Sequence, residues 1–179
     1  MNKKIRKILS KKNKSKIVSL TAYSKQIAKI IDNYCDIVLV GDSMANVLYG
    51  MNNTHNVTLN NMIQHAQSVK KGIKKSLLIV DMPKNSYSNI KKAEKNAKLI
   101  LKKTGCDAIK LESNNKNFNI IEKLVKKRIP VMGHIGYTPQ FKKKFKTEGN
   151  SSKEITKLLK EALWIQKSGA FSIVLECIS

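Results

Sequence analysis

Three runs of mainly aliphatic residues each end on an acidic side chain. DIVLV leads to Asp42 in VGDS, LLIV leads to Asp81, and AIKL leads to Glu112. Carboxylate oxygens from neighbouring strand ends suit Mg²⁺, an ion that prefers octahedral oxygen coordination and keeps positions open for substrate. Each acid could instead cap a helix that follows its strand. The repetition favours one magnesium site built from Asp42, Asp81 and Glu112.

A lysine lies two residues before the last of these acids. Because side chains alternate along a strand, Lys110 and Glu112 should point to the same face. A buried ammonium group is costly unless it meets an anion, so we expect Lys110 to contact the carboxylates or a substrate carboxylate. The alternative is that its long side chain extends past the strand end into solvent.

Two more candidates end later apolar runs. Glu176 follows FSIVL, and a carboxylate in such surroundings should have a raised pKa, which would make it a usable base near neutrality. Its alternative role is a helix cap. His134 lies between two glycines in MGHIG, and a lone histidine is more often structural than catalytic.

Alternating strands and helices would position these side chains. Strands rich in Val, Ile and Leu, each followed by a helix, indicate a parallel sheet covered by helices, in an open doubly wound form or a (β/α)8 TIM-type barrel. Polar residues at the ends of many strands favour the α/β barrel, where all strand ends converge on one mouth. The predicted strands are residues 16–23, 36–42, 76–82, 107–112, 129–136 and 171–177.

The expected domain is a single incomplete (β/α) barrel over residues 1–179, with about six parallel strands. A basic helix or tail over residues 1–15 precedes the first strand. Six strands cannot close an eight-stranded barrel, so an unpaired edge is expected.

Net charge is the most unusual feature of the composition. The chain has 35 Lys and Arg against 12 Asp and Glu, a formal charge of +23, which could indicate a polyanion-binding protein. However, Arg6 and Arg128 are the only arginines, and base readout depends on the arginine fork. The lysines are spread over every helix-like segment, so we interpret them as solvated faces and expect no specific nucleic acid.

Cysteine usage and hydropathy bear on location. The three cysteines are widely spaced without a CxxC, as in reduced thiols of a cytoplasmic protein. No run approaches the roughly 20 apolar residues of a membrane span, and the basic N-terminus lacks the apolar core of a secretory signal. We therefore expect a cytoplasmic protein without membrane contact.

Several motifs, taken together and in chain order, resemble the ketopantoate hydroxymethyltransferase family. They are LTAY, DIVLVGDS, VTLNNMIQHAQSVKKG, DMP with a following SY, DAIKLE, IPVMGHIGYTPQ and GAFSIVLEC. The resemblance covers nearly the whole chain from about Ile17. It implies a phosphoenolpyruvate-mutase-like, Mg²⁺-dependent (β/α)8 barrel that usually assembles into a homo-oligomer, a decamer in the family.

The resemblance also implies a reaction and its residues. The family transfers a hydroxymethyl group from 5,10-methylenetetrahydrofolate to 3-methyl-2-oxobutanoate and forms 2-dehydropantoate for pantothenate and coenzyme A. A Mg²⁺-chelated 2-oxo acid would lose its C3 proton to give a stabilised enolate. The family's roles fall on Asp42, Asp81 and Glu112 for the metal, on Asp42, Ser43, Asp81 and Lys110 for the oxo acid, on Glu176 as proton acceptor, and on His134 and Tyr23 in the pocket lining.

The family pattern continues beyond Glu176 through two further strands. We therefore expect this sequence to be a truncated gene product or a fragment. The alternatives are an inactive remnant of the enzyme, a lysine-rich polyanion-binding protein, and a related Mg²⁺-dependent carbon–carbon lyase. The lyase is disfavoured because the cysteine-bearing lid motif of those enzymes is absent.

Overall fold

The computed structural model describes residues 2–113, 117–142 and 144–179, and the strands in these ranges form one parallel sheet. Neighbouring strands follow the order of the chain, so each connection crosses to the adjacent strand. The strands are β1 (Ser19–Thr21), β2 (Ile37–Val40), β3 (Leu77–Asp81), β4 (Ala108–Glu112), β5 (Val131–Gly136) and β6 (Ser172–Glu176). The prediction of about six parallel strands is confirmed.

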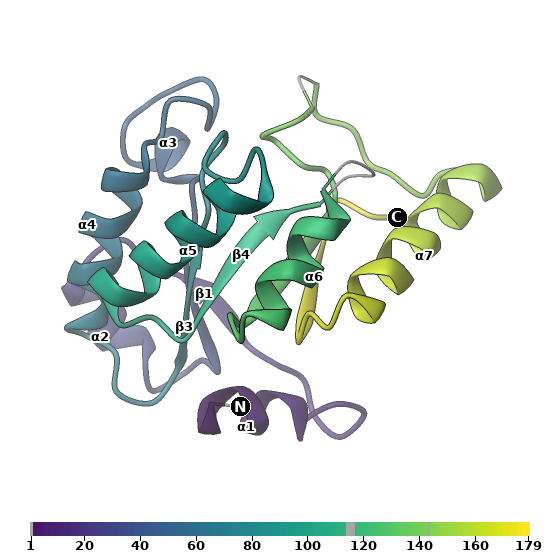
Figure 1. Cartoon of the computed structure of the whole chain (residues 1–179). Helices are drawn as coiled ribbons and strands as arrows, with labels where there is room; N and C mark the ends of the chain where they lie inside the picture. The colour runs from purple at the N-terminus through teal and green to yellow at the C-terminus, as the bar shows by residue number, and fades with distance from the viewer. Residues whose placement is uncertain (1, 114–116, 143) are drawn as a thin grey trace.

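Helices cover the outer face of the sheet, which curls into a half-barrel (Figure 1). Polar side chains cap the N-termini of several of these helices. Gly105, in the left-handed conformation, ends the helix that covers residues 90–104. The helices on this side are α2 (Lys25–Ile31), α4 (Leu59–Lys70), α5 (Ile90–Thr104), α6 (Phe118–Lys126) and α7 (Ser152–Lys167), while the single turn α3 (Met44–Val47) lies at the carboxyl end of β2.

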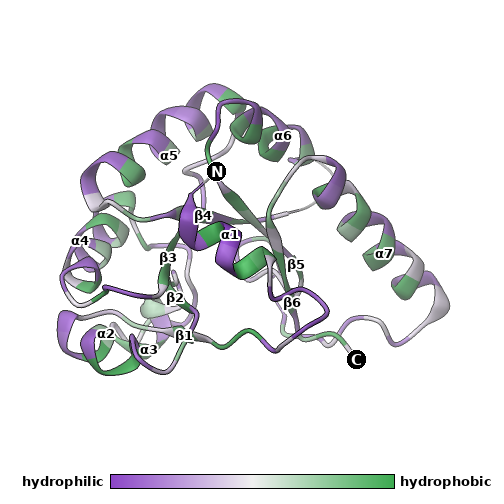
Figure 2. Cartoon of the chain, turned by 90° about the horizontal axis from the view of Figure 1, so that it is seen from below, coloured by the Kyte–Doolittle hydropathy of each residue, from purple (hydrophilic) through white to green (hydrophobic). Residues whose placement is uncertain are grey.

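Alternation along the strands divides the apolar core into two clusters. On β2, Val38 and Val40 pack toward the helices, whereas Ile37 belongs to the cluster inside the curve. The short helix α1 (Lys3–Leu9) adds Ile5 and Ile8 to that inner cluster and lies across the amino ends of the strands (Figure 2). Part of the predicted basic N-terminal segment thus closes one end of the half-barrel.

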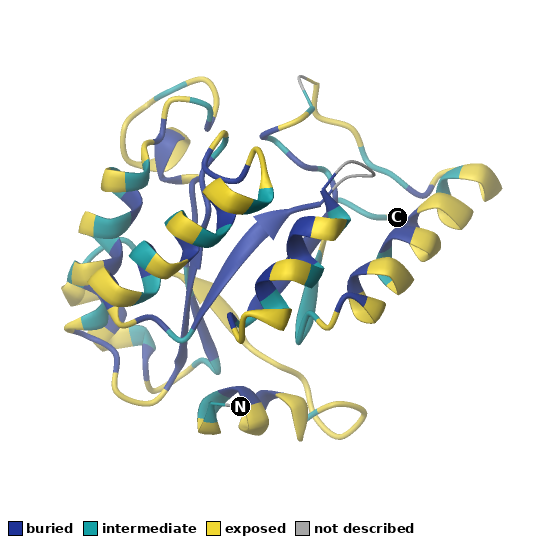
Figure 3. Cartoon of the chain, viewed as in Figure 1, coloured by how far each residue is buried: buried dark blue, intermediate teal, exposed yellow. Residues whose placement is uncertain are grey.

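The first and last strands form the two edges of the sheet. β3, β4 and β5 are buried throughout, whereas β1 is exposed and β6 is half-buried (Figure 3). Each edge strand has one neighbouring strand instead of two, and β1 covers only residues 19–21 of the predicted 16–23. Within the described residues, no helix has both the length and the apolar character to cross a membrane.

Candidate active site at the carboxyl ends of the strands

The predicted acidic residues lie at the ends of three adjacent strands. Asp42 follows β2, Asp81 ends β3 and Glu112 ends β4, and all three are buried. The backbone N–H of Asp42 donates a hydrogen bond of 3.2 Å to Oδ2 of Asp81. The fold therefore brings Asp42 and Asp81 into direct contact.

The turn after β2 packs closely because residue 41 is glycine. A β-carbon on Gly41 would lie 2.9 Å from Oγ of Ser43 and 3.5 Å from Oδ2 of Asp81. The hydroxyls of Ser43 and Tyr23 are 2.8 Å apart, which links the turn to the end of β1. Ser43 is exposed and Tyr23 half-buried, so both hydroxyls lie at the outer rim of the acidic residues.

Lys110 supplies positive charge to this group. Its Nζ lies 3.0 Å from Oδ2 of Asp81, and the two residues are aligned on neighbouring strands. Burial alone would lower the pKa of Lys110, but the charges of Asp81 and Asp42 outweigh it and raise the pKa. Lys110 is the only buried lysine or arginine among the described residues. Its ammonium group meets an anion, as expected, and does not extend into solvent.

The pKa values of the buried acids are raised, because Lys110 does not offset the cost of burying their negative charge. Burial raises the pKa of Asp81 to about 7, although the Lys110 ammonium opposes the shift, and the charge of Asp42 adds to it. Burial and the nearby Asp42 raise the pKa of Glu112 to about 9. The pKa of Asp42 is also raised, mainly by burial. A further cation at this end of the sheet would stabilise the ionised acids.

The donor set fits a hard cation such as Mg²⁺ in part. Oδ1 of Asp81 is buried and, within the described residues, accepts no hydrogen bond, so it has lone pairs for an ion. The same part of the chain contains no group of three or more His, Cys, Asp or Glu side chains arranged to hold a metal. Asp42 and Asp81 are in direct contact. Their roles as metal ligands, like that of Glu112, stay predictions.

His134 and Glu176 meet on β5 and β6. Nε2 of His134 lies 3.1 Å from Oε2 of Glu176, and Nδ1 lies 3.5 Å from Nζ of Lys110. Burial lowers the pKa of His134 more than the contact with Glu176 raises it, so the ring is neutral at pH 7. The chain Glu176–His134–Lys110 thus joins the edge of the sheet to the buried acids.

The expected rise in the pKa of Glu176 is wrong. The contact with His134 lowers this pKa by more than burial raises it. Its side chain is 41% exposed, because β6 is an edge strand. Glu176 is therefore ionised at neutral pH and is a weaker base than the sequence predicted.

Gln140 and Tyr87 join the acidic group without having been predicted as site residues. Gln140 follows β5, is 2% exposed, and donates from Nε2 to Oδ2 of Asp42 over 2.8 Å. The hydroxyl of Tyr87 donates to Oε1 of Gln140 over 2.5 Å. A glutamine in a loop carries no periodic signal, so its part in the GYTPQ motif was the one available pointer.

Comparison with known proteins decides the family. The profile of the ketopantoate hydroxymethyltransferase family matches residues 2–179. This chain belongs to that family. A 3-methyl-2-oxobutanoate hydroxymethyltransferase of Pelagibacter ubique is 54% identical over 178 residues, which cover 99% of this chain and 69% of the relative. The enzyme of that name from Rhizobium etli is 44% identical over 174 residues, covering 95% of this chain and 64% of the relative.

Solved structures of the same fold are more distant in sequence. A phosphonopyruvate hydrolase in complex with oxalate and Mg²⁺ has a TM-score of 0.73 at 10% identity, covering 97% of this chain and 62% of the hydrolase. A 2,3-dimethylmalate lyase of the PEP mutase/isocitrate lyase superfamily has a TM-score of 0.69 at 15% identity, with coverage of 97% and 63%. These likenesses confirm the fold class. This chain spans about two thirds of the length of the two curated relatives named above.

Proposed function

We propose that this chain carries the oxo-acid site of a 3-methyl-2-oxobutanoate hydroxymethyltransferase acting in pantothenate and coenzyme A biosynthesis. The proposed reaction transfers a hydroxymethyl group from 5,10-methylenetetrahydrofolate to 3-methyl-2-oxobutanoate and gives 2-dehydropantoate. The observation that carries the proposal is the buried contact of Asp42, Asp81 and Lys110 at adjacent strand ends, in a chain of this family. Binding of an oxo acid and folate, homo-oligomer formation and a cytoplasmic location belong to the same proposal.

Asp42 and Asp81 are the residues that would hold Mg²⁺. When bound, the ion would polarise the 2-oxo group and stabilise the negative charge of the enolate. Lys110 is the buried cation available for the substrate carboxylate, and the Ser43 hydroxyl, held by Tyr23, is the second donor. Both groups would orient the oxo acid with its C3 proton toward β6.

Glu176 would accept that proton. Its carboxylate is ionised at neutral pH and can accept a proton, and its half-exposed position leaves it free of the ion; the lowered pKa makes it a weaker base than a glutamate of ordinary pKa. The neutral ring of His134, 3.1 Å from Oε2, lies between this base and Lys110 and lines the pocket. The protonated Glu176 could later return a proton to the product.

Exchange of the C3 proton of 3-methyl-2-oxobutanoate in D2O, followed by NMR with Mg²⁺, tests the proposal without folate. We expect the Asp42→Ala variant to exchange at least about 100-fold more slowly than wild type, since it loses a charged group at the reacting centre. Asp36→Ala is the matched control, because Asp36 precedes the same strand at the opposite end of the sheet. Wild-type exchange rates in Asp42→Ala would contradict the proposal.

The formal charge of +23 favours one second candidate, a polyanion-binding protein without catalysis. Lysine–phosphate contacts are screened steeply by salt. Retention on heparin well above physiological salt, together with no C3 exchange by the wild-type chain, would support this candidate. Oxo-acid binding without exchange would instead indicate an inactive remnant of the enzyme.

A further inference from the structure

The Gln140 side chain connects loops that follow three different strands. It enters from the loop after β5, and its Nε2 donates to Oδ2 of Asp42, after β2, and over 3.0 Å to the backbone carbonyl of Met82, after β3. Its backbone N–H donates to Oε2 of Glu112, at the end of β4, over 3.0 Å. One buried residue therefore contacts two of the three predicted acids.

The orientation of the Gln140 amide is fixed at both ends. Tyr87 donates to Oε1, while Asp42 and Met82 accept from Nε2. A flipped amide would place its oxygen against two acceptors and its NH2 group against a donor hydroxyl. The Tyr87 ring is buried and packs edge-on against Phe141 with centroids 6.4 Å apart, which holds the hydroxyl in place.

The contacts of Gln140 restrain the rotation of the Asp42 carboxylate, which is a predicted metal ligand. Asp42 contacts Asp81 through its backbone N–H, so its carboxylate remains free to turn unless another group holds it. Gln140 donates the 2.8 Å hydrogen bond that holds Oδ2 of Asp42, and the nearby Thr54 hydroxyl also lowers the pKa of this carboxyl. Groups that hydrogen-bond to a metal ligand orient it and raise metal affinity.

We propose that Gln140 is a positioning residue that sets the Asp42 carboxylate for a divalent cation, and that Tyr87 sets the Gln140 amide. The inference rests on the proposed function, since that function supplies the reason for a cation beside Asp42 and Asp81. It adds two residues, from the loops after β5 and β3, to the predicted site. Neither residue touches the substrate or the ion in this role.

Mn²⁺ binding to the full chain, measured by calorimetry and by electron paramagnetic resonance without substrate, tests the inference. Gln140→Leu removes the amide at similar volume and is expected to weaken Mn²⁺ binding about 10- to 100-fold. Tyr87→Phe leaves the amide present but without the hydroxyl that orients it, and a weakening of about 3- to 10-fold is expected. The matched controls are Gln166→Leu and Tyr34→Phe, both at exposed positions, and they should bind Mn²⁺ like wild type.

Thermal melting separates positioning from general stability. A merely structural role would lower the melting midpoint of Gln140→Leu but leave its Mn²⁺ affinity at 10 °C unchanged, and that result overturns the inference. If Gln140→Leu does not fold, Tyr87→Phe decides alone, and unchanged affinity in it overturns the inference. Absence of Mn²⁺ binding by the wild-type chain would overturn both this role and the cation in the proposed function, whereas equal binding by all variants would overturn this role only.

Discussion

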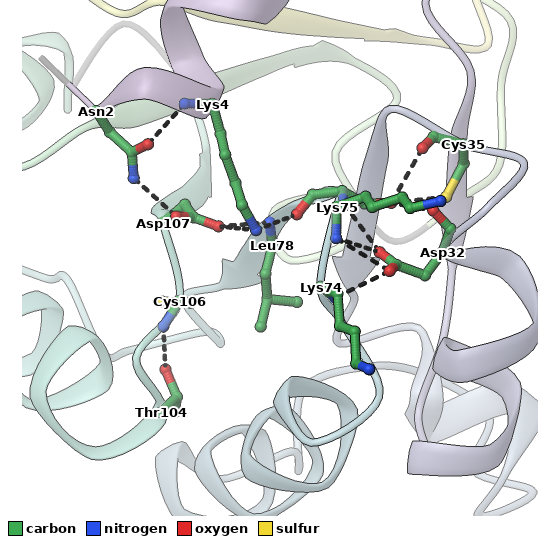
Figure 4. Close-up of polar contacts among 11 residues, drawn as sticks. Asn2, Lys4, Asp32, Cys35, Lys74, Lys75, Leu78, Thr104, Cys106 and Asp107 are labelled. Carbon is green, nitrogen blue, oxygen red and sulfur yellow. Dashed lines mark hydrogen bonds and ion pairs between the residues drawn. The ribbon is translucent and has the colours of Figure 1, made fainter.

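The two ends of the sheet place acidic residues in opposite surroundings. At the amino ends, Asp32 accepts hydrogen bonds from the backbone N–H groups of Lys74, Lys75 and Ser76 (Figure 4). Burial alone would raise the pKa of Asp32, but these bonds outweigh it and lower the pKa. At the carboxyl ends, burial instead raises the pKa of Asp81 to about 7.

The difference lies in what surrounds each carboxylate, because burial acts in the same direction at both ends. Asp107 also lies at the amino ends of the strands, where it accepts hydrogen bonds from the N–H of Leu78 and from Nδ2 of Asn2, on the segment leading into α1 (Figure 4). At the other end, Asp81 keeps a buried oxygen without a donor in the described residues. At the amino ends of the strands, the acidic side chains accept hydrogen bonds from the protein's own backbone. At the carboxyl ends, a buried acidic oxygen has no such donor in the described residues and would need one from a ligand.

The largest expected effect compares an ion pair at each end. Lys110→Met leaves the buried Asp81 without its partner, which should cost about 3–5 kcal/mol of unfolding free energy at pH 8 and abolish oxo-acid binding. Lys11→Met breaks the partly exposed pair with Asp36 and should cost at most about 1 kcal/mol. Urea unfolding and calorimetric titration with 3-methyl-2-oxobutanoate measure both. Equal losses of stability in the two variants would remove the proposed contrast.

A smaller effect is expected from removing the charge of Asp32, at the amino ends of the strands. Asp32→Asn exchanges one acceptor oxygen for an NH2 group that faces backbone donors, so about 2 kcal/mol of unfolding free energy should be lost. Mn²⁺ affinity should stay at the wild-type value, because Asp32 lies at the opposite end of the strands from Asp42. A stable Asp32→Asn protein with impaired Mn²⁺ binding would show that the two ends are coupled.

A third comparison concerns the pH dependence of stability. Burial raises the pKa of Glu112 to about 9, so the unfolded chain binds fewer protons than the folded chain above the ordinary pKa of about 4.3. This group therefore lowers the free energy of unfolding as pH rises from about 5 to 9. Asp32, with its lowered pKa, acts in the opposite sense and loses its contribution only in acid, as pH falls below its ordinary value.

Glu112→Gln imitates the protonated acid and should remove the Glu112 part of this decline. Without divalent cations, the variant and wild type should agree within about 1 kcal/mol at pH 5.5, and the variant should be the more stable at pH 8.5. Urea unfolding at several pH values measures the slope. An unchanged slope would mean that Glu112 is ionised in the folded protein and belongs with the satisfied acids.

The strand ends could be predicted because their signal is local. Alternation of aliphatic strands with helices determines a parallel sheet, and the position of Asp81 or Glu112 after its strand determines the end at which it lies. The alternation of Lys110 with Glu112 likewise predicted a lysine that meets acids. These features require only the sequence near each residue.

The sequence by itself thus determined the fold class, the family and the acids and lysine at the carboxyl ends of the strands. The tertiary structure decided that Gln140 reaches Asp42 across 98 residues of chain and that α1 closes the opposite end. It also decided that Glu176 has a lowered pKa, because edge exposure and the approach of His134 follow from strand order. The local sequence pattern determines the strand and the strand end on which a residue lies. The burial of its side chain and the charges around it depend on every segment that packs against it.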